Sequence, residues 1–225
     1  MKKYLLILVL LGVSIGAWSQ SVNQNCLGAI PICQPLYNQS IGFNGVGTVN
    51  ELNGSNQGCL TTGENNSVWY ILSTSSAGTL VFTITPNGGN SDYDFAVWDL
   101  TDKSCDAISA GLQPVRCNYA SLANSTAGGL TGLALSATSP SYGASGPSFS
   151  AGINVSAGQT FVILINNSSA SNAGYTLNFS GSTCQIAGNT APYIKGDTLP
   201  PTCGGPTSVK VLLSENITCS SLASN

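Results

Sequence analysis

Hydrophobic and polar residues alternate along parts of this chain with the period of two that is typical of half-buried β-strands. From Tyr175 to Phe179 every second residue is large and hydrophobic, and the residues between are polar. Residues 80–85 repeat the pattern, with Thr83 and Thr85 on the polar side. Successive side chains of a strand point to opposite faces, so we expect each of these strands to have one buried face and one wet face.

Three other segments are hydrophobic without interruption, as in strands that are covered on both faces. They are residues 68–72, 95–98 and 161–165. Turns rich in glycine, serine and asparagine separate the strands, for example at 75–78 and 86–90. Short strands at this spacing predict an all-β fold, an antiparallel β-sandwich resembling a jelly roll, with Trp69 and Trp98 in its core.

Residues 118–152 differ from the rest because they are rich in Ala, Ser, Gly and Thr and contain few large hydrophobic side chains. This composition predicts a loop-dominated insertion between core strands. Long surface loops often carry recognition, but the same composition also fits a slack connection without a role of its own.

The sequence predicts a division of the chain into four segments. Residues 1–19 have the Lys2-Lys3 start, the apolar run and the small-residue end of a secretory signal peptide, and the apolar run is too short to span a membrane. Residues 20–187 form the predicted β-sandwich domain. Glycine and proline in residues 188–201 predict a linker, and residues 202–225 predict the first strands of an incomplete Ig-like domain. So short a C-terminal piece cannot bury its own core, so it either packs on the main domain or continues beyond this sequence.

Eight cysteines in an exported chain predict structural disulfides, because thiols pair in oxidising compartments. No C-x-x-C spacing is present, and the chain has no histidine, which excludes mixed Cys/His zinc sites. Spacing alone leaves the connectivity open. Our hypothesis favours short loops and one bridge between the domain ends: Cys26 with Cys184, Cys33 with Cys59, Cys105 with Cys117, and Cys203 with Cys219.

Charge and composition exclude several functions. Only 7% of the residues are charged, and removal of the signal peptide leaves four basic and nine acidic residues, a net charge of about −5. Nucleic-acid binding depends on clustered Lys and Arg, so no nucleic-acid partner is expected. Without histidine, Ser-His-Asp and Cys-His nucleophiles are impossible. Paired carboxylates remain available for hydrolysis, but their separation is not fixed by the sequence, and we predict no enzymatic activity.

The carboxylates also suggest a calcium site. Asp92 and Asp94 are two residues apart and therefore on one face of a strand that follows a glycine-rich turn, and Glu64 precedes another strand. Calcium binds six to eight oxygen ligands, which carboxylates and loop carbonyls supply. The alternative is that Asp92 and Asp94 cap the turn by accepting backbone N–H bonds.

Aromatic residues raise a similar choice between core packing and ligand binding. Trp69 and Trp98 lie inside hydrophobic runs and are expected in the core. Tyr37, Tyr119 and Tyr142 lie in polar, turn-rich sequence and are better candidates for the surface, and we predict that Tyr119 and Tyr142 are available for binding.

Several motifs in order resemble the N-terminal module of large Bacteroidota surface proteins, the gliding-motility-associated, adhesin-like proteins of the type IX secretion system. These motifs are CLGAIPIC at 26–33, GCL at 58–60, GENNSVWY at 63–70, DYDFAVWDL at 92–100, CNY at 117–119 and GYTLNFSG at 174–181. The module itself resembles pre-peptidase C-terminal and CUB-like jelly rolls, which often bind calcium.

The resemblance implies a secreted, cell-surface display or adhesion module with a role in attachment or gliding motility. The implied partners are the type IX secretion machinery and other surface proteins or glycans. The alternative is an accessory domain of a secreted hydrolase that binds carbohydrate or protein. Sequence beyond Asn225 distinguishes these two hypotheses, because repeated β modules favour the first and a catalytic domain favours the second.

Overall fold

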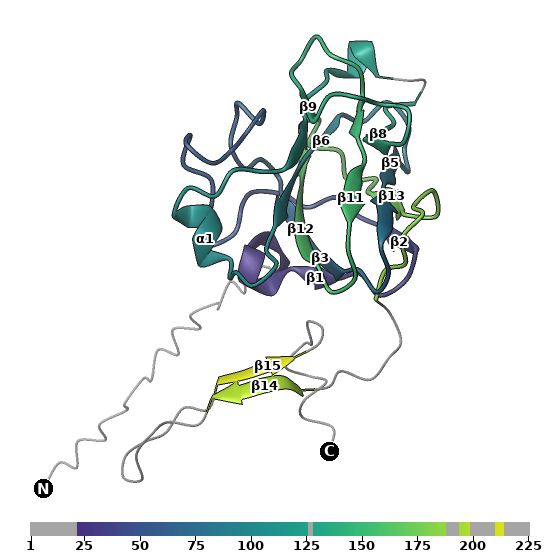
Figure 1. Cartoon of the computed structure of the whole chain (residues 1–225). Helices are drawn as coiled ribbons and strands as arrows, with labels where there is room; N and C mark the ends of the chain where they lie inside the picture. Colours follow the sequence, from purple (N-terminus) through teal and green to yellow (C-terminus); the bar gives the residue numbers. More distant parts are fainter. Residues whose placement is uncertain (1–21, 126–127, 188–193, 199–209, 214–225) are drawn as a thin grey trace, which may run out of the picture.

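The computed structural model describes residues 22–125, 128–187, 194–198 and 210–213, and this part of the chain is nearly all β (Figure 1). Its helices are single turns, namely η1 (Val22–Gln24), η2 (Cys26–Gly28), α1 (Asp106–Ser109) and η3 (Leu122–Asn124). None of the described helices is long and apolar enough to cross a membrane. The predicted signal peptide lies outside the described residues.

Two sheets make up the main domain. The larger has the strand order β1 (Ile30–Pro31), β3 (Val68–Ser73), β12 (Thr160–Asn167), β6 (Tyr93–Asp99), β7 (Arg116–Asn118), β9 (Ser141–Tyr142). The smaller has the order β10 (Phe149–Ala151), β8 (Thr131–Ala134), β5 (Phe82–Pro86), β13 (Tyr175–Asn178), β2 (Leu36–Gln39). A separate two-stranded pair joins β4 (Gly78–Leu80) to β11 (Ile153–Val155).

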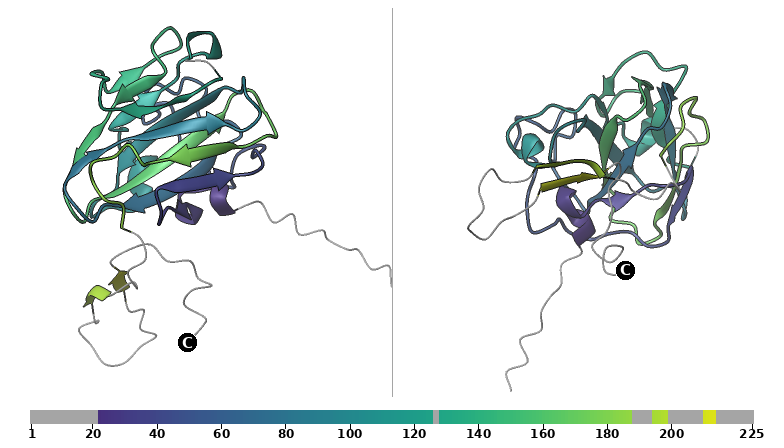
Figure 2. Two further views of the ribbon diagram at one scale, coloured as in Figure 1. Left: turned by 90° about the vertical axis from the view of Figure 1, so that its right-hand side faces the viewer. Right: turned by 60° about the horizontal axis from the view of Figure 1, so that its bottom comes forward.

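The sheets pack in a sandwich-like arrangement, with the main core between them (Figure 2). Tyr70, Phe95 and Ile163 of the six-stranded sheet belong to the same buried cluster as Ile84 and Leu177 of the five-stranded sheet. The all-β prediction is therefore confirmed. The predicted strands are present, but three pairs are parallel, namely β1 with β3 and β7 with β9 in the six-stranded sheet and β8 with β10 in the five-stranded sheet, so both sheets are mixed rather than purely antiparallel.

A second core lies on the outer face of the six-stranded sheet. Trp69 of β3 and Trp98 of β6 point there, with ring centroids 5.3 Å apart, and both are fully buried. Leu52 and Leu60 of the 40–67 connection and Ile108 of α1 cover them. The central strands of this sheet are thus buried on both faces, which explains their unbroken hydrophobic sequence.

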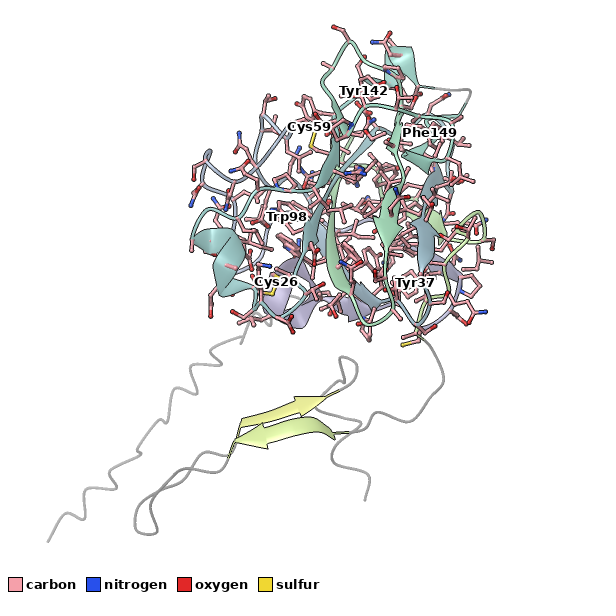
Figure 3. All side chains as sticks on the ribbon, viewed as in Figure 1. Cys26, Tyr37, Cys59, Trp98, Tyr142 and Phe149 are labelled. Atoms are coloured by element: carbon pink, nitrogen blue, oxygen red, sulfur yellow. A yellow bond between two sulfur atoms is a disulfide. The ribbon has the colours of Figure 1, made fainter. Side chains whose placement is uncertain are left out.

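Both disulfides of the described residues lie in this outer layer, on the side of Trp98 (Figure 3). They join Cys26 to Cys105 and Cys59 to Cys117, each with 5.8 Å between Cα atoms. The predicted pairings of these four cysteines were therefore wrong. Our hypothesis favoured short loops, whereas the real bridges tie the covering segments to α1 and β7, a proximity that only the topology creates.

The remaining cysteine predictions have different outcomes. Cys184 is buried and forms no disulfide with any described residue. The predicted bridge between Cys203 and Cys219 lies outside the described residues.

Residues 118–152 lie mostly outside helices and strands, as their composition predicted, but they are not merely an insertion between core strands. They supply β8, β9 and β10, which belong to both sheets. Small side chains make this close packing feasible: a Cβ atom on Gly132 would lie 2.0 Å from the carbonyl oxygen of Phe82. Backbone pairing with neighbouring strands, and not a hydrophobic pattern, determines where these strands lie. The hydrophobic pattern of the sequence therefore did not predict them.

The predicted linker also contains a strand. Residues 194–198 form β14 (Ile194–Thr198), which pairs with β15 (Lys210–Leu213) in an antiparallel ladder. Glycine and proline around this segment concealed the strand, because they interrupt the alternation on which the prediction rested.

Candidate functional site

The predicted calcium ligands of the turn after β5 are engaged within the protein. Asp94 of β6 is paired in register with Asn166 of β12 on the outer face of the six-stranded sheet, and only 3% of its surface is exposed. The Ser168 hydroxyl donates to Asp94 Oδ2 at 2.5 Å. Burial, together with the neighbouring Asp92 carboxylate, raises the pKa of Asp94 to about 7.

Asp92 acts as a backbone cap. Its carboxylate accepts the N–H of Leu122 at the start of η3, and burial raises its pKa. Its own N–H donates to the Ser169 hydroxyl at 2.8 Å. These contacts differ from the turn-capping alternative, because Asp92 accepts a backbone N–H far from the 86–90 turn and Asp94 accepts a side-chain hydroxyl.

The half-buried Glu64 pairs with the buried Glu51. Glu64 Oε1 accepts the N–H of Glu51 at 2.7 Å, and Glu64 Oε2 accepts the Ser67 hydroxyl at 3.2 Å. Glu51 Oε1 accepts the N–H of Cys26 at 2.8 Å, while Glu51 Oε2 is buried without a donor among the described residues. Burial and the Glu64 charge raise the pKa of Glu51 to about 7. Burial also raises the pKa of Glu64, and the two carboxyl groups are close enough to disfavour simultaneous ionisation.

The carboxylates therefore do not gather into a metal-binding cluster in the part of the chain that the structure describes. No three Asp, Glu, Cys or His side chains there gather closely enough to hold a metal ion. Asp92, Asp94 and Glu64 instead bind separate backbone and hydroxyl groups. The residues present do not fit the proposed calcium site, and Glu51 and Asp94 are too buried to meet a substrate.

The two predicted binding tyrosines are brought together at one edge of the six-stranded sheet, where β9 and Tyr142 lie in Figure 3. The N–H of Tyr119 donates to the carbonyl oxygen of Tyr142 at 2.9 Å. Both side chains are half-buried: Tyr119 packs against the outer core, and the backbone of Gly146 lies against the Tyr142 ring. They form a small structural corner rather than an exposed aromatic platform.

A surface that the sequence did not identify is the outer face of the five-stranded sheet. The view in the left panel of Figure 2 shows its strands with no element in front of them. The register of β2, β13, β5, β8 and β10 places one row of outward residues across the sheet. That row is Leu36, Asn178, Thr83, Gly132 and Phe149, and a second row contains Asn38, Thr176 and Thr85.

This face is uncharged. No Asp, Glu, Lys or Arg occurs in any of its five strands, whereas the six-stranded sheet contains Asp94, Asp99 and Arg116. Its polar groups are hydroxyls and amides, which both donate and accept hydrogen bonds. Such a surface matches a neutral partner rather than a nucleic acid or a strongly charged one.

Hydrogen bonds fix part of this face before any partner binds. The Thr176 hydroxyl donates to Asn87 Oδ1 at 3.2 Å, and Asn87 Nδ2 donates to Asn38 Oδ1 at 3.2 Å. Asn178 Oδ1 accepts the N–H of Ser180 at 2.9 Å. A pre-ordered surface loses less side-chain entropy on binding. The sequence signal was the polar side of the two alternating strands, which we interpreted only as a wet face.

Comparisons with known proteins give no relative for this chain. No protein-family model matches it, no curated protein matches it, and no solved structure matches it. The family resemblance in the sequence motifs therefore remains a prediction, and the functional argument depends on the surfaces described above.

Proposed function

We propose that this chain is a secreted, non-enzymatic display or adhesion module that binds neutral partners through the outer face of the five-stranded sheet. The observation that carries the proposal is the contrast between the two sheets. One is buried on both faces beneath a disulfide-bonded layer, whereas the other presents an open, uncharged and partly pre-ordered face.

The absence of histidine and the state of the acids support a non-enzymatic role. A general acid or base must reach the substrate within hydrogen-bond distance. Glu51 and Asp94 have the raised pKa values that acid–base chemistry favours, but they are 4% and 3% exposed and bind neighbouring protein groups. Their pKa values reflect burial within a structural layer.

The two disulfides support an extracellular location for this protein. Two disulfides are compatible with an extracellular protein, since such bonds persist in oxidising compartments. The predicted signal peptide and the resemblance to type IX-secreted surface proteins point to the same location, with other surface proteins or glycans as partners.

Adhesion should depend on the open face. We expect beads coated with the mature chain to be retained under flow on cells of the source organism or on its surface polysaccharide. The double variant Thr83→Lys, Thr176→Lys places two charges on the face and should weaken retention about tenfold or more, a cost of about 1.4 kcal/mol. Bead counts at increasing shear give the measurement.

A matched control changes two exposed threonines elsewhere. Thr61→Lys, Thr62→Lys alters the loop that covers the six-stranded sheet and should leave retention unchanged. Equal losses in both variants would assign adhesion to another surface. Retention of wild-type beads at the level of uncoated beads would contradict the adhesive role itself.

A further inference from the structure

The four outermost strands of the two sheets are not equally protected against pairing with another chain. Exposed edge strands offer unpaired N–H and C=O groups, and proteins usually cover them or interrupt them with charge or proline. β1 contains Pro31, which has no N–H to donate, and β9 is only two residues long.

The β10 edge is covered by side chains of β7. Arg116 Nε donates to the carbonyl oxygen of Ala151 at 2.7 Å, and Arg116 Nη2 donates to that of Gly152 at the same distance. Asn118 Nδ2 donates to the carbonyl oxygen of Pro147 at 3.0 Å. The carbonyls at both ends of β10 are therefore occupied.

β2 has none of these protections. The N–H of Phe179 donates to the carbonyl oxygen of Pro35 at 2.7 Å, so alternate residues of the ladder turn their backbone toward β13. By the same alternation, the N–H and C=O groups of Leu36 and Asn38 point away from the sheet. No backbone hydrogen bond from another described segment reaches them.

The surroundings of this edge are hydrophobic and uncharged. The Leu36 side chain is 52% exposed, and Ile41, just beyond the strand, is 64% exposed. No charged residue occurs between Gln20 and Asn50. The remainder of residues 22–187 contains seven acidic and two basic residues, so two copies of the domain repel each other on most other faces.

We infer that β2 pairs in antiparallel fashion with β2 of a second copy of this chain. An antiparallel ladder is self-complementary about Tyr37: Leu36 of one copy faces Asn38 of the other, and the two pairs form about four backbone hydrogen bonds. Two negatively charged copies repel each other least when they meet at this uncharged edge. This inference rests on the proposed display function and names one of its partners.

The size of the contact sets its strength. Four residues per copy bury far less than the roughly 1,000 Å² that a stable interface needs, so a single contact is weak and short-lived. Such a contact is effective when many copies are displayed on opposing surfaces, because simultaneous contacts multiply their effect. It gives homophilic attachment that reverses readily.

Sedimentation equilibrium of the mature chain at increasing concentration tests the inference. We expect reversible dimerisation that strengthens as salt screens the net negative charge. Leu36→Lys places like charges near each other across the pair and should weaken dimerisation about fivefold. Leu135→Lys, which changes another exposed leucine (59% exposed), should leave it unchanged.

Charge exchange distinguishes self-pairing from other modes of association. A mixture of the Leu36→Lys and Leu36→Glu variants should recover dimers that neither variant forms alone to the same extent. A wild-type chain that stays monomeric at all accessible concentrations and salt levels overturns the inference, as does equal dimerisation of wild type and Leu36→Lys. Face-dependent bead adhesion with a monomeric chain would leave the proposed function intact while overturning the self-pairing of β2.

Discussion

Replacing Cys26 and Cys105 with alanine, or Cys59 and Cys117, should lower the free energy of unfolding by about 4 kcal/mol for each pair. The bridges close loops with sequence separations of 79 and 58, and long loops gain most from cross-linking because the unfolded chain loses the most freedom. Urea denaturation under non-reducing conditions measures the change. Both losses together approach the whole stability of an ordinary domain.

Cys184→Ala is the matched control, because it removes a buried sulfur that bridges to no described residue. We expect a cost of roughly 1 kcal/mol for the lost packing. The bridge variants should also expose the outer layer first, so hydrogen exchange should rise in residues 51–60 before it rises in β12. If the bridge variants are no less stable than Cys184→Ala, side-chain packing alone stabilises the outer layer and the disulfides contribute nothing to its stability.

Stability should also fall as the pH rises from 5 to 8. Glu51 and Asp94 have pKa values of about 7 in the folded protein, above the ordinary values of 4.5 and 3.8. A raised folded pKa gives stability that is complete below the unfolded value and is lost as the pH rises through the folded value. At about 1.4 kcal/mol per pKa unit, the loss should be on the order of 2 to 3 kcal/mol for each of the two carboxyl groups, seen as a lower melting temperature at pH 8.

Glu51→Gln and Asp94→Asn identify the groups responsible. Each amide stays neutral at every pH, so the double variant should show a nearly flat pH profile between 5 and 8. Asp102→Asn changes an exposed acid and should keep the wild-type slope. A wild-type profile that is flat, or that rises with pH, would show that these carboxyls ionise without cost in the folded state.

The strands of the core were predictable because burial leaves a direct record in the sequence. Strands β3 (Val68–Ser73) and β12 (Thr160–Asn167) are covered on both faces. Few residue types other than hydrophobic ones fit such positions, so the two sequences are hydrophobic with little interruption. β8 and β10 left no such record, since Gly132 and Ser150 fit by being small and by pairing through the backbone.

The candidate site was less predictable, because the environment of a polar residue depends on segments distant in sequence. Asp94 resembles an exposed turn residue by pattern, yet it is buried beside Asn166 and bound by Ser168. The pairing of Glu51 with Glu64 depends on how the 40–67 connection crosses the outer core. To predict the open face, one must know that one sheet is covered and the other is not. No local sequence pattern contains this information.

The Cys26–Cys105 bridge also determines how this domain responds to tension. A force applied between the two ends of the domain passes from Cys26 directly to Cys105 through the sulfurs, and the 79 residue steps between them carry no load. At about 3.5 Å per residue, roughly 280 Å of chain cannot be drawn out while the bond is intact. Those residues include β2, β3, β5 and β6, so four core strands stay within a covalent loop even when the later strands are pulled away.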